Sequence, residues 1–221
     1  MSRSNSIPRS SASPRIPDPP LVLTISTQFP DAEDQMRTSE FLDATTAIVG
    51  LAERFGKVFS FVTYDMNTNI QKLRLKYEEN KENNGFLTDM ILKEQHEGEV
   101  TATDALMWLR RELHFLSNFF QCVIDDTFSH RSSSDLTPFF SKAYTETLEQ
   151  YHGWLGSQLL NVLSRFAPCR SSFLSVLGQN RDGAIVTDMH SYNQKLTACV
   201  RWLTEFYSVH GLETFATVIL I

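Results

Sequence analysis

Residues 101–116, TATDALMWLRRELHFL, decide the fold class of this 221-residue chain. Apolar side chains recur there every three or four residues, and the pattern continues beyond the quoted stretch, with Leu106, Leu109, Leu113, Leu116, Phe120 and Val123 on one stripe. Such spacing places apolar side chains on one face of an α-helix, which must then pack against other elements. We therefore predict a long amphipathic helix from Thr101 to about Asp126.

The same helical spacing extends to both sides of this stretch, from Thr38 onward, and no hairpin signal interrupts it. A break at Gly56, a turn at Asn83 to Gly85, a loop near Ser132 to Pro138 and a stop at Pro168 divide the pattern. The sequence predicts the other helices at residues 39–54, 59–79, 86–95, 139–166, 171–177 and 188–210. Seven or eight helices with short connections favour an all-α fold, a two-layer helical sandwich of about eight helices.

The first 20 residues are rich in Ser, Pro and Arg and nearly lack large apolar side chains. Such a segment cannot bury enough surface to offset its ordering entropy. We expect residues 1–37 to form a disordered or loosely docked extension and residues 38–221 to form the folded domain. No stretch approaches the roughly 18 apolar residues of a membrane-spanning helix. A cytosolic protein that touches membranes only transiently is the natural expectation.

Composition excludes several classes of function. The net charge is −6 and the isoelectric point about 5.5, whereas a nucleic-acid binder needs a surplus of Lys and Arg. The three cysteines are far apart and form no CxxC pair, so neither a metal site nor a redox motif is expected. The chain also lacks a G-x-S-x-G nucleophile motif. We therefore predict no catalytic residues, no metal and no cofactor.

Three features could nevertheless carry chemistry. Asp65, Asn69 and Lys72 have spacings of four and three, which put an acceptor, an amide and an ammonium side by side on a helix. Trp108 lies off the apolar stripe of its own helix, among charged residues, and His152 lies in a YHGW segment. Each feature also has an ordinary interpretation: a solvated helix face, a surface indole or a structural histidine.

Taken together, these pieces resemble a known family. The segments VFSFVTYDMNTNIQKL (58–73), TATDALMWLRRELHFL (101–116) and AYTETLEQYHGWLGSQLLNVLSRFAPCRSSFL (143–174) resemble the signature stretches of the glycolipid transfer protein superfamily, in the same order. The opening FLDATTAIVGLAERFGKVF (41–59) is similar to the family's first helix and turn. The resemblance implies lipid chains slotted between two helical layers, with the headgroup held at the surface.

The resemblance also implies roles for individual residues. Asp65 would accept hydrogen bonds from the ceramide amide and from sugar hydroxyls, and Asn69 and Lys72 would bond the first sugar. Trp108 would stack beneath that sugar, while His152 would donate to the amide carbonyl. Apart from the resemblance, helix geometry turns Trp154 away from the face of His152, where an indole either docks to the headgroup layer of a membrane or packs against a neighbouring helix. Phe59, Val62, Leu106, Phe115, Leu116, Phe166 and Leu203 are expected to contribute to the core or to the wall of the lipid slot.

Differences between branches of the family bear on the headgroup. The ceramide-1-phosphate branch places Lys where Asn69 stands and Arg at the positions of Asp104 and Trp108. Those cations would pair with a phosphate, whereas Asp104 would repel one. Two departures from the family pattern are notable: Glu112 stands where a small residue is expected, and the chain ends in the apolar run FATVILI (215–221).

The predicted function is therefore an intermembrane carrier of one glycosphingolipid of the glucosyl-, galactosyl- or lactosylceramide class, which performs no covalent chemistry. Its expected partners are that lipid and a transient membrane surface, not nucleic acid; the sequence names no protein partner. Two alternatives stay open, a sphingolipid sensor or adaptor that acts through the N-terminal extension, and a ceramide-1-phosphate carrier.

Overall fold

The computed structural model describes residues 28–31, 35–55, 59–152, 158, 160, 165, 167–178 and 182–213. Within these residues the regular structure is helical, with isolated β-bridges at Arg37–Phe86 and Asp135–Cys169. The helices are α1 (Thr38–Glu53), α2 (Ser60–Glu79), α3 (Leu87–Glu97), α4 (Thr101–Phe128), α5 (Thr137–Thr147), α7 (Arg170–Leu177) and α8 (Asp182–Val209). The all-α prediction is confirmed.

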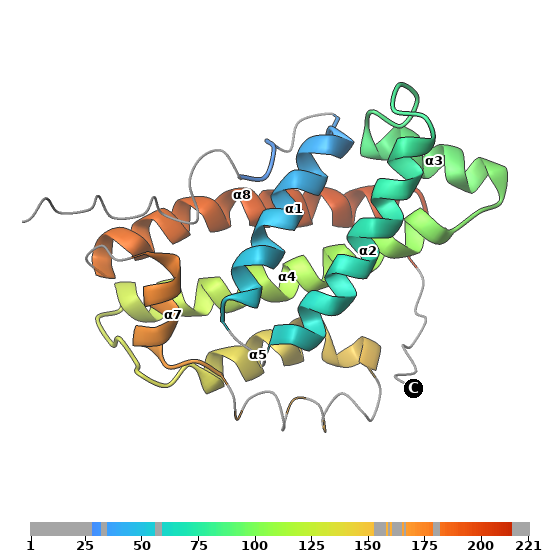
Figure 1. Ribbon diagram of the computed structural model, residues 1–221. Coiled ribbons are helices and arrows are strands. Elements are labelled where there is room, and N and C mark those ends of the chain that lie inside the picture. The colour runs from blue at the N-terminus through green and yellow to red at the C-terminus, as the bar shows by residue number, and fades with distance from the viewer. Residues whose placement is uncertain are drawn as a thin grey trace, which may run out of the picture.

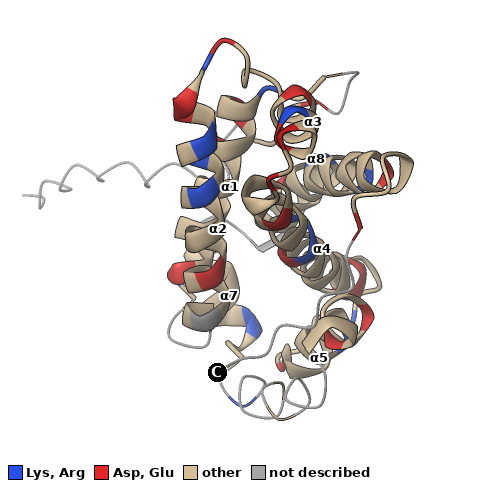
Figure 2. Cartoon of the chain, turned by 90° about the vertical axis from the view of Figure 1, so that its right-hand side faces the viewer, with Lys and Arg blue, Asp and Glu red and all other residues tan. Residues whose placement is uncertain are grey.

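The helices form two layers. α1 and α2 lie side by side and run across α8 and α4, which lie behind them (Figure 1). The end view separates α1 and α2 from a second layer of α8, α4 and α5 (Figure 2). α4 packs against α2, α3, α5 and α8, so it is the central element of the domain. This arrangement confirms the two-layer sandwich.

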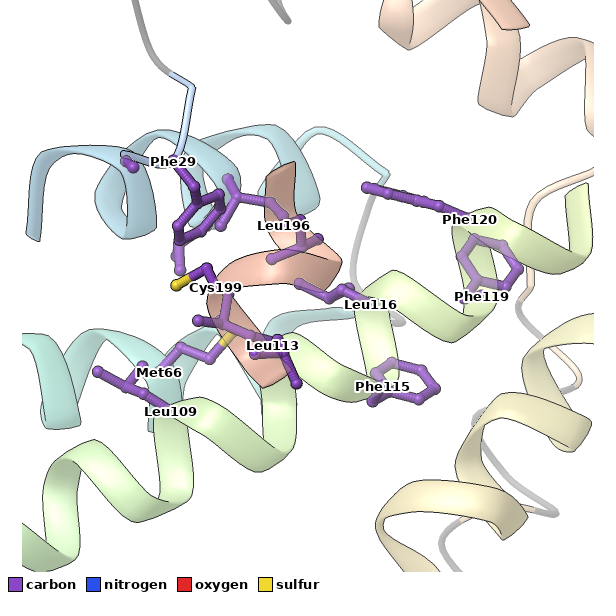
Figure 3. Packing of buried hydrophobic residues seen from close by; sticks show 14 of the residues in the cluster. Phe29, Met66, Leu109, Leu113, Phe115, Leu116, Phe119, Phe120, Leu196 and Cys199 are labelled. Carbon is purple, nitrogen blue, oxygen red and sulfur yellow. The ribbon is translucent and has the colours of Figure 1, made fainter. Parts of the chain in front are cut away.

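The core lies between the layers. Every residue of the apolar stripe predicted on α4 is buried. Met66 from α2, Leu109 and Leu113 from α4, and Leu196 and Cys199 from α8 converge there (Figure 3). Further along α4 the core becomes aromatic, since the ring of Phe140 meets those of Phe59, Phe115 and Phe119 edge to face. Of the residues expected to build the core or slot wall, all but Phe166 are buried; Phe166 lies outside the described residues.

Side chains also fix the start of α4. α3 ends at Gly98, whose φ of 77° is the left-handed conformation that favours glycine. The carboxylate of Glu94, on the last turn of α3, then accepts hydrogen bonds from the backbone amides of Ala102 and Thr103. These amides belong to the first turn of α4 and have no partner within the helix. The cap sets the position of α4, and with it that of Trp108 two turns later.

Three helix boundaries differ from the predictions. The predicted helix 139–166 begins earlier, at Thr137, and α5 ends at Thr147, with Leu148 in a turn before helical residues 149–152. The Thr147 hydroxyl donates to the Ala143 carbonyl, a local bond that bends helices. α8 begins at Asp182, six residues before the predicted start, because burial of Ile185 and Val186 outweighs the poor helix propensity of Gly183.

The N-terminal boundary remains a prediction. Residues 1–27, including most of the predicted extension, lie outside the described residues. Two residues on the N-terminal side of Thr38, Phe29 and Met36, are buried in the core, and the Phe29 ring packs edge-on against Tyr192 of α8. Whatever the state of the preceding segment, residues 28–31 and 35–37 pack as part of the domain.

Candidate functional site

α2 and α4 present polar side chains to each other where the two layers meet. On α2, Asn69 is buried and its amide nitrogen donates to the Asp65 carboxylate at 3.4 Å. Asp65 is half-buried. On α4, the carboxyl of Glu112 lies against Asp65 and is itself buried. Asp65 and Asn69, four residues apart on one face of α2, therefore form a polar patch with Glu112 of α4.

Trp108 and His152 extend this patch. Their rings are nearly parallel, with planes 6° apart and centroids 6.2 Å apart. Burial lowers the pKa of His152; the negative charge of Asp65 opposes this shift and the positive charge of Arg111 adds to it. The imidazole is therefore neutral at pH 7. The structure thus brings Asp65, Asn69, Trp108 and His152 together.

The two remaining predicted residues have different outcomes. Lys72 lies on the same face of α2 as Asp65 and Asn69, one turn farther along, and its side chain is exposed. The structure places it beside the patch without showing a contact to Trp108 or His152. Trp154 lies outside the described residues, so its predicted role in membrane docking stays a prediction.

Arg111 supports the aromatic part of the site. Its guanidinium lies 4.7 Å from the centroid of the Trp108 ring and 3.7 Å from that of Tyr151. The same guanidinium pairs with Glu213 at 2.9 Å, and Glu213 also pairs with Arg110 at 2.6 Å. The indole thus packs on a buried cation that pairs with Glu213, a residue that follows α8 and is shared by the two arginines. The quoted segment TATDALMWLRRELHFL contains Arg111, but no sequence signal identified Glu213 as its partner.

Tyr144 fixes the orientation of His152. Its hydroxyl lies 2.7 Å from Nδ1 of His152. Burial raises the pKa of Tyr144 to about 12, so the hydroxyl keeps its proton and can donate it to Nδ1. In the tautomer in which the hydroxyl donates to Nδ1, the neutral imidazole carries its proton on Nε2, which is left to donate to another group. The sequence analysis missed Tyr144, although a spacing of eight residues places it two helical turns before His152.

Replacement of Tyr144 by Phe tests this support. Loss of the hydroxyl leaves Nδ1 of His152 without its partner, and an unsatisfied buried group costs about 1–3 kcal/mol. We expect the free energy of unfolding, measured by urea denaturation, to fall by about that amount. Tyr64→Phe is the matched control, because the Tyr64 side chain is exposed on α2 and should change stability little. Equal stabilities for the two variants would contradict the assignment.

Comparison with known proteins agrees with this architecture. A family model described as Glycolipid transfer protein (GLTP) matches residues 36–179, more than half of the chain. The chain belongs to the glycolipid transfer protein family. The Glycolipid transfer protein of Danio rerio is 32% identical over 157 residues, covering 68% of this chain and 75% of that protein.

Other members of the glycolipid transfer protein family are larger. The human Pleckstrin homology domain-containing family A member 8 is 31% identical over 214 residues, which cover 89% of this chain but 40% of the relative. The chain therefore spans less than half the length of such relatives. The solved structure that addresses how FAPP2 selects simple glycosphingolipids using the GLTP-fold has a TM-score of 0.80 and 28% identity, and covers 90% of this chain and all of its own. The mouse ceramide-1-phosphate transfer protein shares the fold, with a TM-score of 0.77 at 22% identity over 86% of this chain and 95% of its own.

Proposed function

We propose that this protein binds one glycosphingolipid with an uncharged sugar headgroup and carries it between membranes, without covalent chemistry. The observation that carries the proposal is the meeting of Asp65, Asn69, Trp108 and His152 at one polar patch above an apolar interior. A carboxylate, an amide, an imidazole N–H and an indole face suit a ligand with many hydroxyls and no charge. Membership of the glycolipid transfer protein family supports the same conclusion.

Each side chain has a role that matches its surroundings. Asp65 accepts hydrogen bonds from the ceramide amide and a sugar hydroxyl, while Asn69 and Lys72 bond the first sugar. Trp108 provides the flat surface beneath that sugar, held in place by Arg111. His152 donates from Nε2 to the amide carbonyl, because Tyr144 occupies Nδ1. A site built for such groups loses much affinity when the ligand lacks them, which gives selectivity.

The apolar interior supplies the thermodynamic reason for a carrier. Exposure of a buried methylene costs about 0.8 kcal/mol, so two long lipid chains crossing water unprotected would cost roughly 20 kcal/mol. Two helical layers that part to admit the chains remove most of this barrier. No helix of the described residues is long and apolar enough to cross a membrane. We propose that the protein works in the cytosol and docks reversibly on membranes, in part through Trp154.

Charge argues for a sugar over a phosphate. The two arginines that follow Trp108 on α4 both pair with Glu213, and Arg111 also lies against the rings of Trp108 and Tyr151, so both guanidinium groups are directed to groups within the protein. Asp104, one turn before Trp108, is exposed and negative. A phosphate at this position would be repelled by the carboxylates of Asp65 and Asp104, which outnumber the exposed Lys72 on the same face of α2. Ceramide-1-phosphate transport is therefore the weaker candidate.

A vesicle-to-vesicle assay tests the proposal. Labelled galactosylceramide in donor vesicles should move to acceptor vesicles far faster with the protein than without it. Ceramide-1-phosphate with the same acyl chain should move more slowly. Tight binding of galactosylceramide without transfer would favour the sensor or adaptor function. Preferential transfer of ceramide-1-phosphate would overturn the proposed substrate class.

The same assay tests the indole surface. Trp108→Ala should weaken binding of galactosylceramide about tenfold, because aromatic contacts contribute about 0.5–1.5 kcal/mol beyond the area they bury. Trp202→Ala is a control, since the Trp202 ring stacks on Phe206 of α8, away from the patch. Full affinity of the Trp108 variant would remove this residue from the binding site.

A further inference from the structure

Glu112 occupies an unusual position in the site. It lies on α4 one helical turn after Trp108, and only 5% of its surface is exposed. One of its carboxyl oxygens, Oε2, is buried and has no hydrogen-bond partner among the described residues. An acceptor buried without a partner is costly and is rare in folded proteins. The location of this atom in the polar patch indicates a group that a ligand completes.

The neighbours of Glu112 determine its charge. From α2 it faces Asp65, and from the helical turn 149–152 the neutral His152 borders the same patch. On its own helix the adjacent Arg111 is directed to Glu213 and to the rings of Trp108 and Tyr151. No described cation therefore pairs with Glu112. Burial, followed by the charge of Asp65 and a hydrogen bond with it, raises the pKa of Glu112 well above its usual range.

A protonated carboxyl beside Asp65 has a defined hydrogen-bonding pattern. Its O–H donates to the Asp65 carboxylate, and its other oxygen, Oε2, remains an acceptor. That acceptor is satisfied by a hydroxyl or an amide N–H. A fully ionised phosphate headgroup offers only acceptors and carries negative charge, so it cannot donate to Oε2 and is repelled by Asp65.

We propose that Glu112 is a specificity-determining residue of this site, which binds in its uncharged form by accepting a hydrogen bond from a sugar hydroxyl of an uncharged sphingolipid headgroup. The inference rests on the proposed function. It assigns a second carboxyl group, next to Asp65, to recognition of the lipid. It also makes binding dependent on pH, because loss of the proton places two negative charges side by side and removes the donor that holds the pair together.

Two substitutions distinguish the role of the acceptor oxygen of Glu112 from that of its charge and from its contribution to folding. Glu112→Gln keeps the shape, a donor toward Asp65 and an acceptor, but cannot ionise. Glu112→Leu keeps a similar volume and removes every polar atom. Asp125→Asn is the matched control, since Asp125 is an exposed acid on the same helix, far along α4 from the site.

Binding of galactosylceramide and of ceramide-1-phosphate with the same acyl chain, presented in phosphatidylcholine vesicles, is measured from pH 5.5 to pH 9. We expect the affinity of the wild-type protein for galactosylceramide to fall as the pH rises through the raised pKa of Glu112. The affinity of Glu112→Gln should stay near the wild-type value and should not change with pH. At pH 6, Glu112→Leu should bind galactosylceramide about tenfold more weakly than the wild type does, but should bind ceramide-1-phosphate as tightly as the wild type. The control should match the wild type throughout.

Stability gives a readout that does not depend on the lipid. The folded-state pKa of Glu112 lies above that of the unfolded chain, so its contribution to stability is complete below about pH 4.5 and is lost as the pH rises through the folded value. Glu112→Gln should therefore raise the Tm by about 2–4 °C at pH 8 and by nothing at pH 4.

The outcomes are distinguishable. The role of Glu112 would be overturned if Glu112→Leu kept full affinity for galactosylceramide, or if binding by Glu112→Gln depended on pH as in the wild type. Either result would leave the carrier function intact. A wild-type protein that binds neither lipid, or prefers ceramide-1-phosphate at every pH, would overturn the proposed function itself.

Discussion

Replacement of Asp65 by Val is expected to abolish uptake of galactosylceramide while leaving the helices folded. Asp65 offers the charged acceptor of the patch, and hydrogen bonds to charged groups contribute about 1.5–3 kcal/mol each. Loss of two such bonds, to the amide and to a sugar hydroxyl, weakens binding by roughly 100-fold or more. The fold should survive, because α2 is anchored in the core by Met66, Ile70 and Leu73 on a neighbouring stripe.

Measurement combines the transfer assay with circular dichroism. Asp43→Val is the control, because Asp43 on α1 is an exposed acid whose removal changes the net charge equally. Normal transfer by the control and none by the Asp65 variant, with equal helix content, is the expected pattern. An Asp65 variant that is folded and still transfers galactosylceramide at the wild-type rate would show that the headgroup lies elsewhere.

The sequence predicted the fold well where local periodicity determines it. The apolar stripe of α4 and the turn at Asn83 to Gly85 were predicted from spacing and composition, and both are present. The prediction failed where a local bond or tertiary packing overrides propensity. The helix predicted over 139–166 is interrupted by a turn at Leu148, where α5 ends, and buried residues near Gly183 extend α8 toward its N-terminus.

The site divides in the same way. Asp65, Asn69 and Lys72 share a face of one helix, so their grouping follows from the sequence alone. Three pairings across elements do not: Asp65 with Glu112, Tyr144 with His152 across the turn at Leu148, and Arg111 with Glu213, which are 102 residues apart. Such contacts depend on how the layers pack. They decide which oxygens and nitrogens are left to face a ligand.

The support of Trp108 leads to a second large effect. Arg111→Met should lower the affinity for galactosylceramide by more than tenfold, because it removes the cation on which both Trp108 and Tyr151 pack. A cation against a desolvated aromatic face contributes about 2 kcal/mol, and it holds the indole in one orientation. The affinity loss should exceed those of both Trp202→Ala and Trp108→Ala, because the cation supports Tyr151 as well as Trp108.

Arg110→Met is a matched control within the same ion-pair cluster. Both arginines are buried and both pair with Glu213, but Arg110 lies over the Tyr207 ring and not over Trp108. Each variant leaves Glu213 with one arginine, so both should lose a similar stability of about 1–3 kcal/mol in urea denaturation. Only Arg111→Met should bind galactosylceramide more weakly, because only this variant removes the support of the Trp108 ring. Equal losses of affinity would mean that the charge balance around Glu213, and not the packing beneath Trp108, governs the headgroup site.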